Sequence, residues 1–282
     1  MNLDTNHISD LVWRRADADV QSIVKILSRG DVSLNVCLFH VVELSAPTFP
    51  KFVDIIQLVR DLPIVLGNPV ENIFDEELAC ACAAACGRTR RPPRVFARDL
   101  SEWGYVGTVQ GTAVDLLEFY ATHQNHRDRL ISAFDYFSRY DRLKRDAAVV
   151  RDPMLPITLQ MEEHLTKLRL TTPQYADALS AREVLDKVGG VPALPAYEIY
   201  QQVMLQRLTH LEKITSGNDL RDEYVACYTP YAAVTVLDRR TAHRVKQAKQ
   251  SSAPRVTRYL KEVPDILQRI HDGQLGFVPS AW

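Results

Sequence analysis

Acidic side chains stand at the ends of apolar segments that read as strands. Asp4 closes the short strand candidate Asn2–Asp4, and Asp238 follows the apolar run Ala233–Leu237. Glu43 lies in an otherwise apolar stretch shortly after another strand-like run. A carboxylate at the end of a buried strand is costly unless something compensates its charge. A divalent cation removes the repulsion between converging carboxylates, and oxygen ligands suit Mg²⁺ or Mn²⁺.

Two further acids and a basic segment extend this pattern toward phosphate chemistry. Asp219 and Asp222 lie in the first turns of the helix expected over Asn218–Tyr228, which leads into the strand that ends before Asp238. A Mg²⁺ ion held by a few carboxylates can activate water and stabilise a phosphoryl transition state. From Arg239 to Lys261 there are eight Lys or Arg and no Asp or Glu, although the net charge of the chain is −1.

Because the basic segment starts directly after an acid of the predicted site, we expect it to contact the phosphate backbone of a nucleic acid. The side chains nearest the predicted site are Arg239, Arg240, Arg244 and Lys246. The proline-containing loop Arg88–Arg98, with five Arg, is a weaker candidate for the same role. The sequence has no Walker loop, no dinucleotide-binding glycine fingerprint and no nucleophile elbow, so nothing supports those rival chemistries.

Four motifs, in order along the chain, resemble those of PIN-domain nucleases, the fold of VapC-type toxins. The stretch LDTNHIS (Leu3–Ser9) resembles the opening strand motif, and VVEL (Val41–Leu44) is similar to the second acidic position. GNDLRDEY (Gly217–Tyr224) resembles the third acidic region, which leaves Asp219 and Asp222 as alternatives, with the spacing favouring Asp222. VTVLDRR (Val234–Arg240) resembles the closing pattern, in which a strand ends at an Asp followed by a basic or polar residue.

The resemblance implies a metal-dependent endonuclease that acts on RNA in preference to DNA. It implies that one or two Mg²⁺ or Mn²⁺ ions are held by the acids of the four motifs, and that a metal-bound water leaves a 5′-phosphate and a 3′-hydroxyl. The expected catalytic acids are Asp4, Glu43, Asp222 and Asp238, with Asp219 as a further metal ligand and Thr5 and Asn6 supporting Asp4.

Two alternatives stay open. The chain could be a non-catalytic interaction module that keeps the PIN-like fold, or a DNA-directed nuclease of a bacterial defence system, since a fold alone does not fix a function. Convergence of the acids discriminates, because acids on opposite faces would favour the non-catalytic module. A regulatory protein partner and a homodimer are also left open.

The elements that must position these residues alternate between strand and helix at both ends of the chain. Strands are expected at Asn2–Asp4, Asp31–Cys37, Leu62–Leu66, Ala233–Leu237 and Arg255–Tyr259. The first long helix is expected over Asp10–Ser28. The middle shows mostly helical periodicity. We therefore predict an α/β fold, with a PIN-like parallel sheet flanked by helices in 1–66 and 214–282 and a mostly α-helical insertion at 67–213.

Composition supports an ordinary globular protein. The 282 residues are 46% hydrophobic and 24% charged, which excludes a disordered or collagen-like chain. The five Cys have no His at zinc-ligand spacing and read as small buried residues of a reducing compartment. The first residues lack the features of a signal peptide, and no apolar run is long enough to span a membrane. A cytoplasmic location is the expectation.

Overall fold

The computed structural model describes most of both ends of the chain and parts of the middle. The described residues are 1–46, 52–88, 92–100, 111–133, 135, 159, 162, 163, 165, 166, 169, 179–190, 193–208, 217–247 and 252–277. Side chains of 217–220 are not among the described features. Within these ranges, no helix combines the length and the apolar character needed to cross a membrane.

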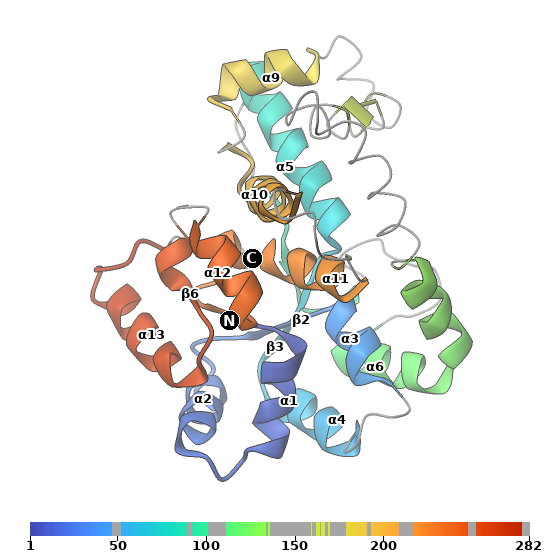
Figure 1. Cartoon of the computed structure of the whole chain (residues 1–282), viewed down its shortest axis with the longest axis vertical. Coiled ribbons are helices and arrows are strands. Elements are labelled where there is room, and N and C mark those ends of the chain that lie inside the picture. Colours follow the sequence, from blue (N-terminus) through green and yellow to red (C-terminus); the bar gives the residue numbers. More distant parts are fainter. Residues whose placement is uncertain are drawn as a thin grey trace.

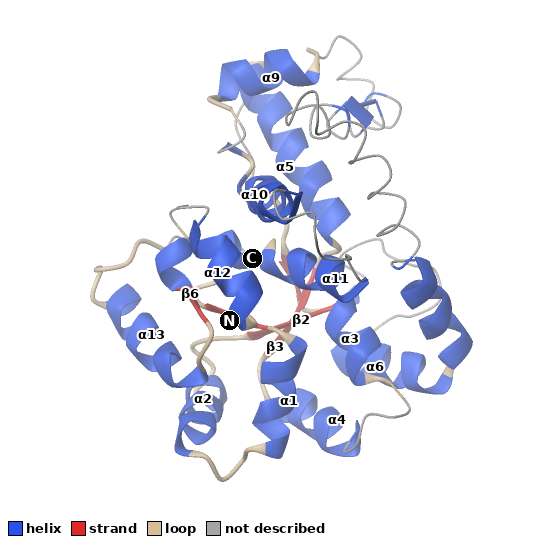
Figure 2. Cartoon of the chain, in the orientation of Figure 1, coloured by secondary structure: helices blue, strands red, loops and turns tan. Residues whose placement is uncertain are grey.

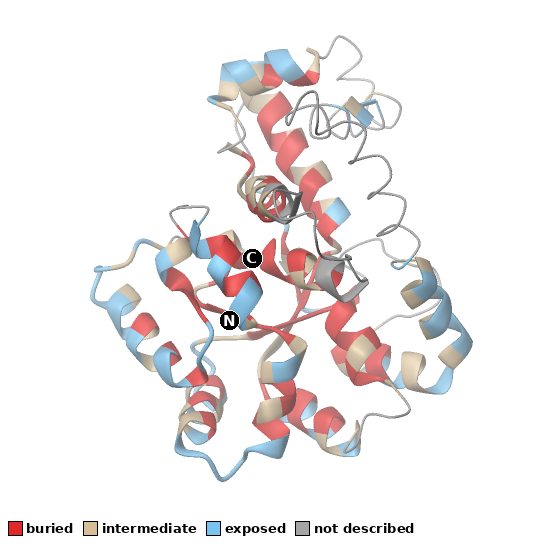
Figure 3. Ribbon diagram, viewed as in Figure 1, coloured by how far each residue is buried: buried red, intermediate tan, exposed pale blue. Residues whose placement is uncertain are grey.

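A six-stranded, mostly parallel sheet forms the centre of the protein, as the α/β prediction requires. Its strand order is β4-β3-β2-β1-β5-β6, and only the β3–β4 pair is antiparallel. The strands are β1 (Asn2–Leu3), β2 (Leu34–Cys37), β3 (Ile64–Gly67), β4 (Phe96–Ala97), β5 (Thr235–Val236) and β6 (Val256–Thr257). Nearly all strand residues are buried, which is typical of a parallel sheet covered on both faces, and Figure 3 shows the strands among the buried elements.

Helices cover both faces of this sheet (Figures 1 and 2). One core cluster lies under α1, α2, α4, α6 and α13, and the other under α5, α9, α10, α11 and α12. The first group comprises α1 (Thr5–Trp13), α2 (Ala18–Ser28), α4 (Phe52–Asp61), α6 (Ala113–Thr122) and α13 (Val263–His271). The second comprises α5 (Val70–Ala85), α9 (Ala181–Val188), α10 (Pro195–Leu208), α11 (Gly217–Ala226) and α12 (Arg239–Gln247). The short helix α3 (Leu38–Leu44) contributes to both clusters.

The prediction of one helix over Asp10–Ser28 is wrong, because this stretch contains the end of α1 and all of α2. The chain turns in the polar residues between them, where the Arg14 guanidinium contacts Asp10 at 3.2 Å and Asp17 at 2.7 Å. Helix α1 starts much earlier than expected, directly after β1, because the Asp4 side chain caps its first turn.

The predicted insertion contributes to the sheet and to its cover. Strand β4 pairs with β3, so the sheet continues into the middle of the chain. Helix α6 packs on α3 and α4, and an ion pair of 2.8 Å joins Arg60 on α4 to Glu118 on α6. Helices α5, α9 and α10 extend beyond the sheet (Figure 1).

A buried carboxylate anchors this extension. Glu77 on α5 is 2% exposed and accepts hydrogen bonds from the backbone N–H groups of Ala196 (2.7 Å) and Tyr197 (3.1 Å) at the start of α10. The Tyr231 hydroxyl donates a further hydrogen bond to the same carboxylate. A negative charge is favourable at a helix N-terminus. Glu77 therefore fixes α10 relative to α5 and to the turn that precedes β5.

The centre of the sheet contains a buried amide pair. The Asn35 side chain donates to the Asn2 side chain at 3.0 Å, and Asn2 donates to the Val225 carbonyl on α11 at 3.0 Å. Gly67 lies against this group, because a Cβ there would stand 2.6 Å from the Asn35 amide oxygen and 2.7 Å from the Tyr228 ring. The pair ties β1 and β2 to α11, one of the elements that carry predicted site residues.

Candidate acidic site and adjoining basic pocket

Two predicted acids leave the sheet at the ends of neighbouring strands. Asp4 follows β1 and Asp238 follows β5, and the register of these parallel strands places Leu3 beside Val236. The Asp4 backbone N–H donates to the Val236 carbonyl at 2.9 Å. Ligands of parallel α/β sheets bind at the carboxyl ends of the strands. Asp4 and Asp238 thus lie at the same carboxyl-terminal edge of the sheet, where the site was predicted from the sequence.

Asp4 is buried and already paired within the chain. One of its carboxylate oxygens accepts from the His7 backbone N–H at 2.9 Å and lies 2.5 Å from His7 Nδ1. Burial lowers the pKa of His7, but the hydrogen bond and the charge of Asp4, with smaller contributions from Asp10 and Arg258, outweigh it and raise the pKa.

The motif-based reasoning did not identify His7, although it belongs to the first quoted motif. Its position three residues after a helix-capping Asp was the available signal, because residues three apart lie on one side of a helix.

Glu43 is paired with a cation from a distant part of the chain. One of its carboxylate oxygens lies 3.0 Å from Arg221 Nε on α11, and the other accepts a hydrogen bond from the Thr5 hydroxyl. The Arg221 side chain is 10% exposed and the Glu43 side chain 31%. Thr5 was expected to support Asp4, but its hydroxyl bonds to Glu43 instead.

The remaining predicted site residues are Asn6, Asp219 and Asp222. Asn6 is exposed and forms no side-chain hydrogen bond with any described residue. Asp222 is half-buried on α11, next in sequence to Arg221. Asp219 also belongs to α11, but its side chain lies outside the described features.

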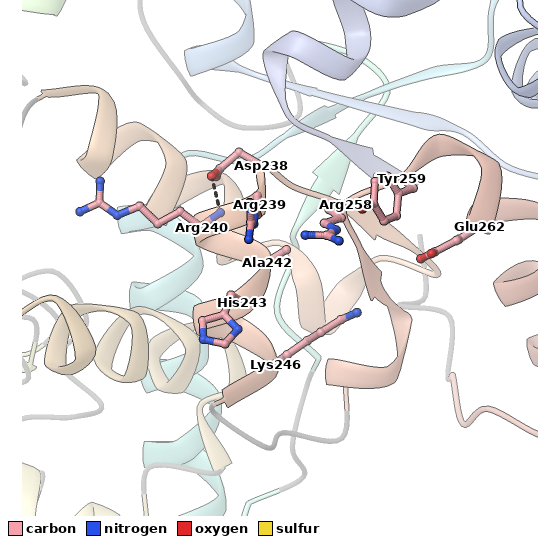
Figure 4. A pocket seen from close by; sticks show the side chains of 9 residues that line it. All are labelled: Asp238, Arg239, Arg240, Ala242, His243, Lys246, Arg258, Tyr259 and Glu262. Atoms are coloured by element: carbon pink, nitrogen blue, oxygen red, sulfur yellow. Dashed lines mark hydrogen bonds between the residues drawn. The ribbon is translucent and has the colours of Figure 1, made fainter.

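Asp238 caps helix α12. Its carboxylate accepts a hydrogen bond from the backbone N–H of Arg240 at 2.7 Å (Figure 4) and another from that of Thr241 at 3.3 Å. The capping and metal-binding roles considered for this residue are compatible, because a carboxylate has several lone pairs. Asp238 also lines a pocket that no other predicted acid reaches among the described residues.

This basic pocket has a volume of about 730 Å³ and lies between α12 and the turn after β6. Its lining carries four Lys or Arg and two carboxylates. The lining residues are Asp238, Arg239, Arg240, Ala242, His243, Lys246, Arg258, Tyr259 and Glu262. Figure 4 shows Arg239, Arg258 and Lys246 directed into the pocket, whereas the Arg240 guanidinium extends away from them.

Arg244 does not join the other predicted nucleic-acid contacts. Its side chain is buried on the opposite face of α12, with Nη1 3.8 Å from the carboxylate of the fully buried Glu223. The sequence reasoning missed His243, Arg258 and Tyr259. Helical spacing could have separated Arg244 from the pocket side, since Arg239, Ala242, His243 and Lys246 follow the i, i+3, i+4, i+7 pattern of one helix face.

The type of donor fits a hard divalent cation, but the arrangement does not form a complete site. Carboxylates are suitable ligands for Mg²⁺ and Mn²⁺. Among the described residues, no three His, Cys, Asp or Glu side chains come close enough together to hold an ion. Asp4 and Glu43 instead contact His7 and Arg221.

Comparisons with known proteins identify no relative. We found no match of this chain to any protein-family model, to any curated protein or to any solved structure.

Proposed function

We propose that this protein is a PIN-like, Mg²⁺- or Mn²⁺-dependent endonuclease that hydrolyses phosphodiester bonds, with RNA preferred over DNA. The observation that carries the proposal is the position of Asp4 and Asp238 at the carboxyl ends of the neighbouring strands β1 and β5, with the basic pocket beside Asp238. Glu43 is joined to the same edge through Thr5. These contacts support the proposal by relating three of the four predicted catalytic acids to the ends of β1 and β5.

The acids would hold the ion, and the pocket would hold the nucleic acid. In this proposal Asp4, Glu43 and Asp238 are ligands, with Asp222 or Asp219 contributed by α11. When bound, the ion would supply an activated water and stabilise charge on the phosphoryl group. Since Asp4 contacts His7 and Glu43 contacts Arg221, an ion held by these acids would have to displace those two side chains.

The pocket residues have separate roles in this proposal. Arg239 and Lys246 would contact backbone phosphates and keep a strand beside the acids. Arg244 would act indirectly, because its pairing with Glu223 joins α12 to α11.

The test is cleavage of labelled single-stranded RNA and DNA with Mg²⁺, with Mn²⁺ and with a chelator. We expect metal-dependent cutting by the wild type and a loss of at least ~100-fold in Asp4→Asn, as is usual when a residue central to charge stabilisation is removed. Asp265→Asn is the matched control, since Asp265 is an exposed Asp on α13. Equal cutting by Asp4→Asn and wild type would contradict the proposal. Preferred cutting of DNA would support the DNA-directed alternative.

A second candidate is a nucleic-acid-binding module without catalysis. It is favoured by one observation, that Asp4 and Glu43 already have basic partners within the chain, His7 and Arg221. A module of this kind would bind oligonucleotides with the same affinity in Mg²⁺ and in chelator and cut none of them. Metal-dependent cleavage that is lost in Asp4→Asn would exclude it.

A further inference from the structure

We propose that Arg258 and Tyr259 form a stacking site for one unpaired nucleobase. We propose further that this site sets which nucleotide stands beside the acidic edge, where Asp4 and Asp238 follow strands β1 and β5. The inference deepens the proposed function and rests on it for its meaning. The binding step itself requires no metal and no cleavage.

Tyr259 presents an aromatic ring where a ligand can reach it. It is 40% exposed, one of four large hydrophobic side chains that are exposed among the described residues. The Arg258 guanidinium carbon lies 4.5 Å from the centre of its ring, and Lys261 Nζ lies 5.3 Å from it. Unpaired bases stack on aromatic rings and on guanidinium planes alike. The pair therefore offers two flat surfaces of the kind that a base prefers.

The turn that carries this pair is braced. The Tyr259 backbone N–H donates to the Thr257 hydroxyl at 3.1 Å, and that hydroxyl donates to Glu262. Arg258 and Tyr259 line the same pocket as Asp238, which follows β5. A base bound at this turn would thus lie in the pocket that Asp238 lines.

The opposite wall of the pocket fits a polynucleotide backbone. Arg239, His243 and Lys246 share one face of α12. From Arg239 to Lys246 the helix rises about 10 Å, at about 1.5 Å per residue. That length corresponds to about three stacked nucleotides at about 3.4 Å each. The pocket is lined by four Lys or Arg and two carboxylates, Asp238 and Glu262, so positive charge is in excess there.

A duplex cannot use the stacking surface, because its bases are already paired and stacked. The pocket therefore favours a single strand whose backbone follows α12 and whose base enters between α12 and the turn after β6. Duplex binding through phosphates alone would not depend on the ring of Tyr259.

The experiment measures binding in chelator, so that nothing is cleaved, with short single-stranded RNA and DNA oligonucleotides that carry a fluorescent 2-aminopurine. Stacking of this base quenches its fluorescence. We expect Tyr259→Ala to weaken binding by roughly 5- to 150-fold and to remove the quenching, from about 1–3 kcal/mol per stacked base. Tyr259→Phe keeps the ring and should stay within about twofold of wild type.

Two controls make the result specific. Arg258→Ala should weaken both binding and quenching, whereas Arg269→Ala, which removes an exposed Arg of α13 outside the pocket, should change neither. A duplex of the same sequence should bind equally well to wild type and Tyr259→Ala. Unchanged binding by Tyr259→Ala, or no binding by the wild type, would overturn the inference.

The two proposals can fail separately. Quenching lost in Tyr259→Ala without any metal-dependent cleavage would support the stacking site and contradict the nuclease. Cleavage by wild type and Tyr259→Ala at the same rate and the same sites would support the nuclease and contradict the stacking site.

Discussion

His40 should make the folded protein sensitive to mild acid. It lies on α3, the helix that carries Glu43, and its side chain is fully buried. Its Nδ1 accepts a hydrogen bond from the Cys37 backbone N–H at 3.1 Å, which requires that nitrogen to be unprotonated. Burial lowers the pKa of His40 from 6.5 to about 4. The folded protein therefore keeps this ring neutral at pH values where the unfolded chain takes up a proton.

The size of the effect follows from the two pKa values. Above pH 6.5 neither state binds the proton, and His40 contributes no pH dependence. As the pH falls toward about 4, the unfolded state is favoured progressively, by about 1.4 kcal/mol per pH unit. The free energy of unfolding should thus fall by about 1.4 kcal/mol at pH 5.5 and by about 3 kcal/mol near pH 4 from this residue alone.

The assay is urea denaturation between about pH 7.5 and pH 4.5 for wild type and His40→Gln. The Gln amide oxygen can accept from the Cys37 N–H but does not titrate. Because all other ionisable groups are common to both proteins, the difference between the two curves isolates His40. Parallel curves would refute the reasoning. An NMR titration of the wild type supplies a second readout, in which a His40 signal that titrates near pH 6.5 would also refute it.

Three further predictions concern groups that hold the site and its supports. Because the pKa of His7 is raised, its pairing stabilises the fold fully below about pH 6.5 and less as the pH rises through the folded pKa; in thermal denaturation, His7→Gln should therefore lose most stability in acid. Gly67→Ala should cost about 1–3 kcal/mol by overpacking, whereas Gly276→Ala, with nothing within 4 Å, should stay within about 0.5 kcal/mol in urea denaturation. Glu77→Gln should lower the free energy of unfolding by about 1–3 kcal/mol. Glu76→Gln, which removes an exposed ion pair with Arg94, should lower it by less than about 1 kcal/mol. Equal losses in the two variants would contradict the anchoring role of the buried carboxylate.

The sheet and its acidic edge could be predicted because both depend on local sequence patterns. Apolar runs bounded by polar residues predicted all five parallel strands to within a few residues. The position of Asp4 and Asp238 at one edge follows from parallel pairing, once each is placed at a strand end. Strand β4 was not predicted, because its two residues lie in a stretch that reads as a proline-containing basic loop and pair only through the tertiary fold.

The partners of the acids could not be predicted in the same way. Arg221 reaches Glu43 only because α11 packs over the edge of the sheet, a contact between residues far apart in sequence. Arg244 and Lys246 both belong to the basic segment, and only their angular positions on α12 separate a buried partner of Glu223 from a pocket cation. Tyr259 belongs to no recognisable sequence motif. It becomes a candidate for base stacking only because the fold places it beside Arg258 and opposite α12.

The pairing of the acids changes how the site should be understood. Unpaired carboxylates at a buried edge would destabilise the fold until an ion arrived. Here Asp4 contacts His7, Glu43 contacts Arg221 and Asp238 accepts hydrogen bonds from the first N–H groups of α12. Under the proposed function, an ion would have to displace His7 and Arg221 from the first two acids. Asp238 differs, because backbone donors leave its charge uncancelled, and it is also the acid of the three that lines the basic pocket. The phosphate backbone and the ion of the proposed function would therefore meet first at Asp238.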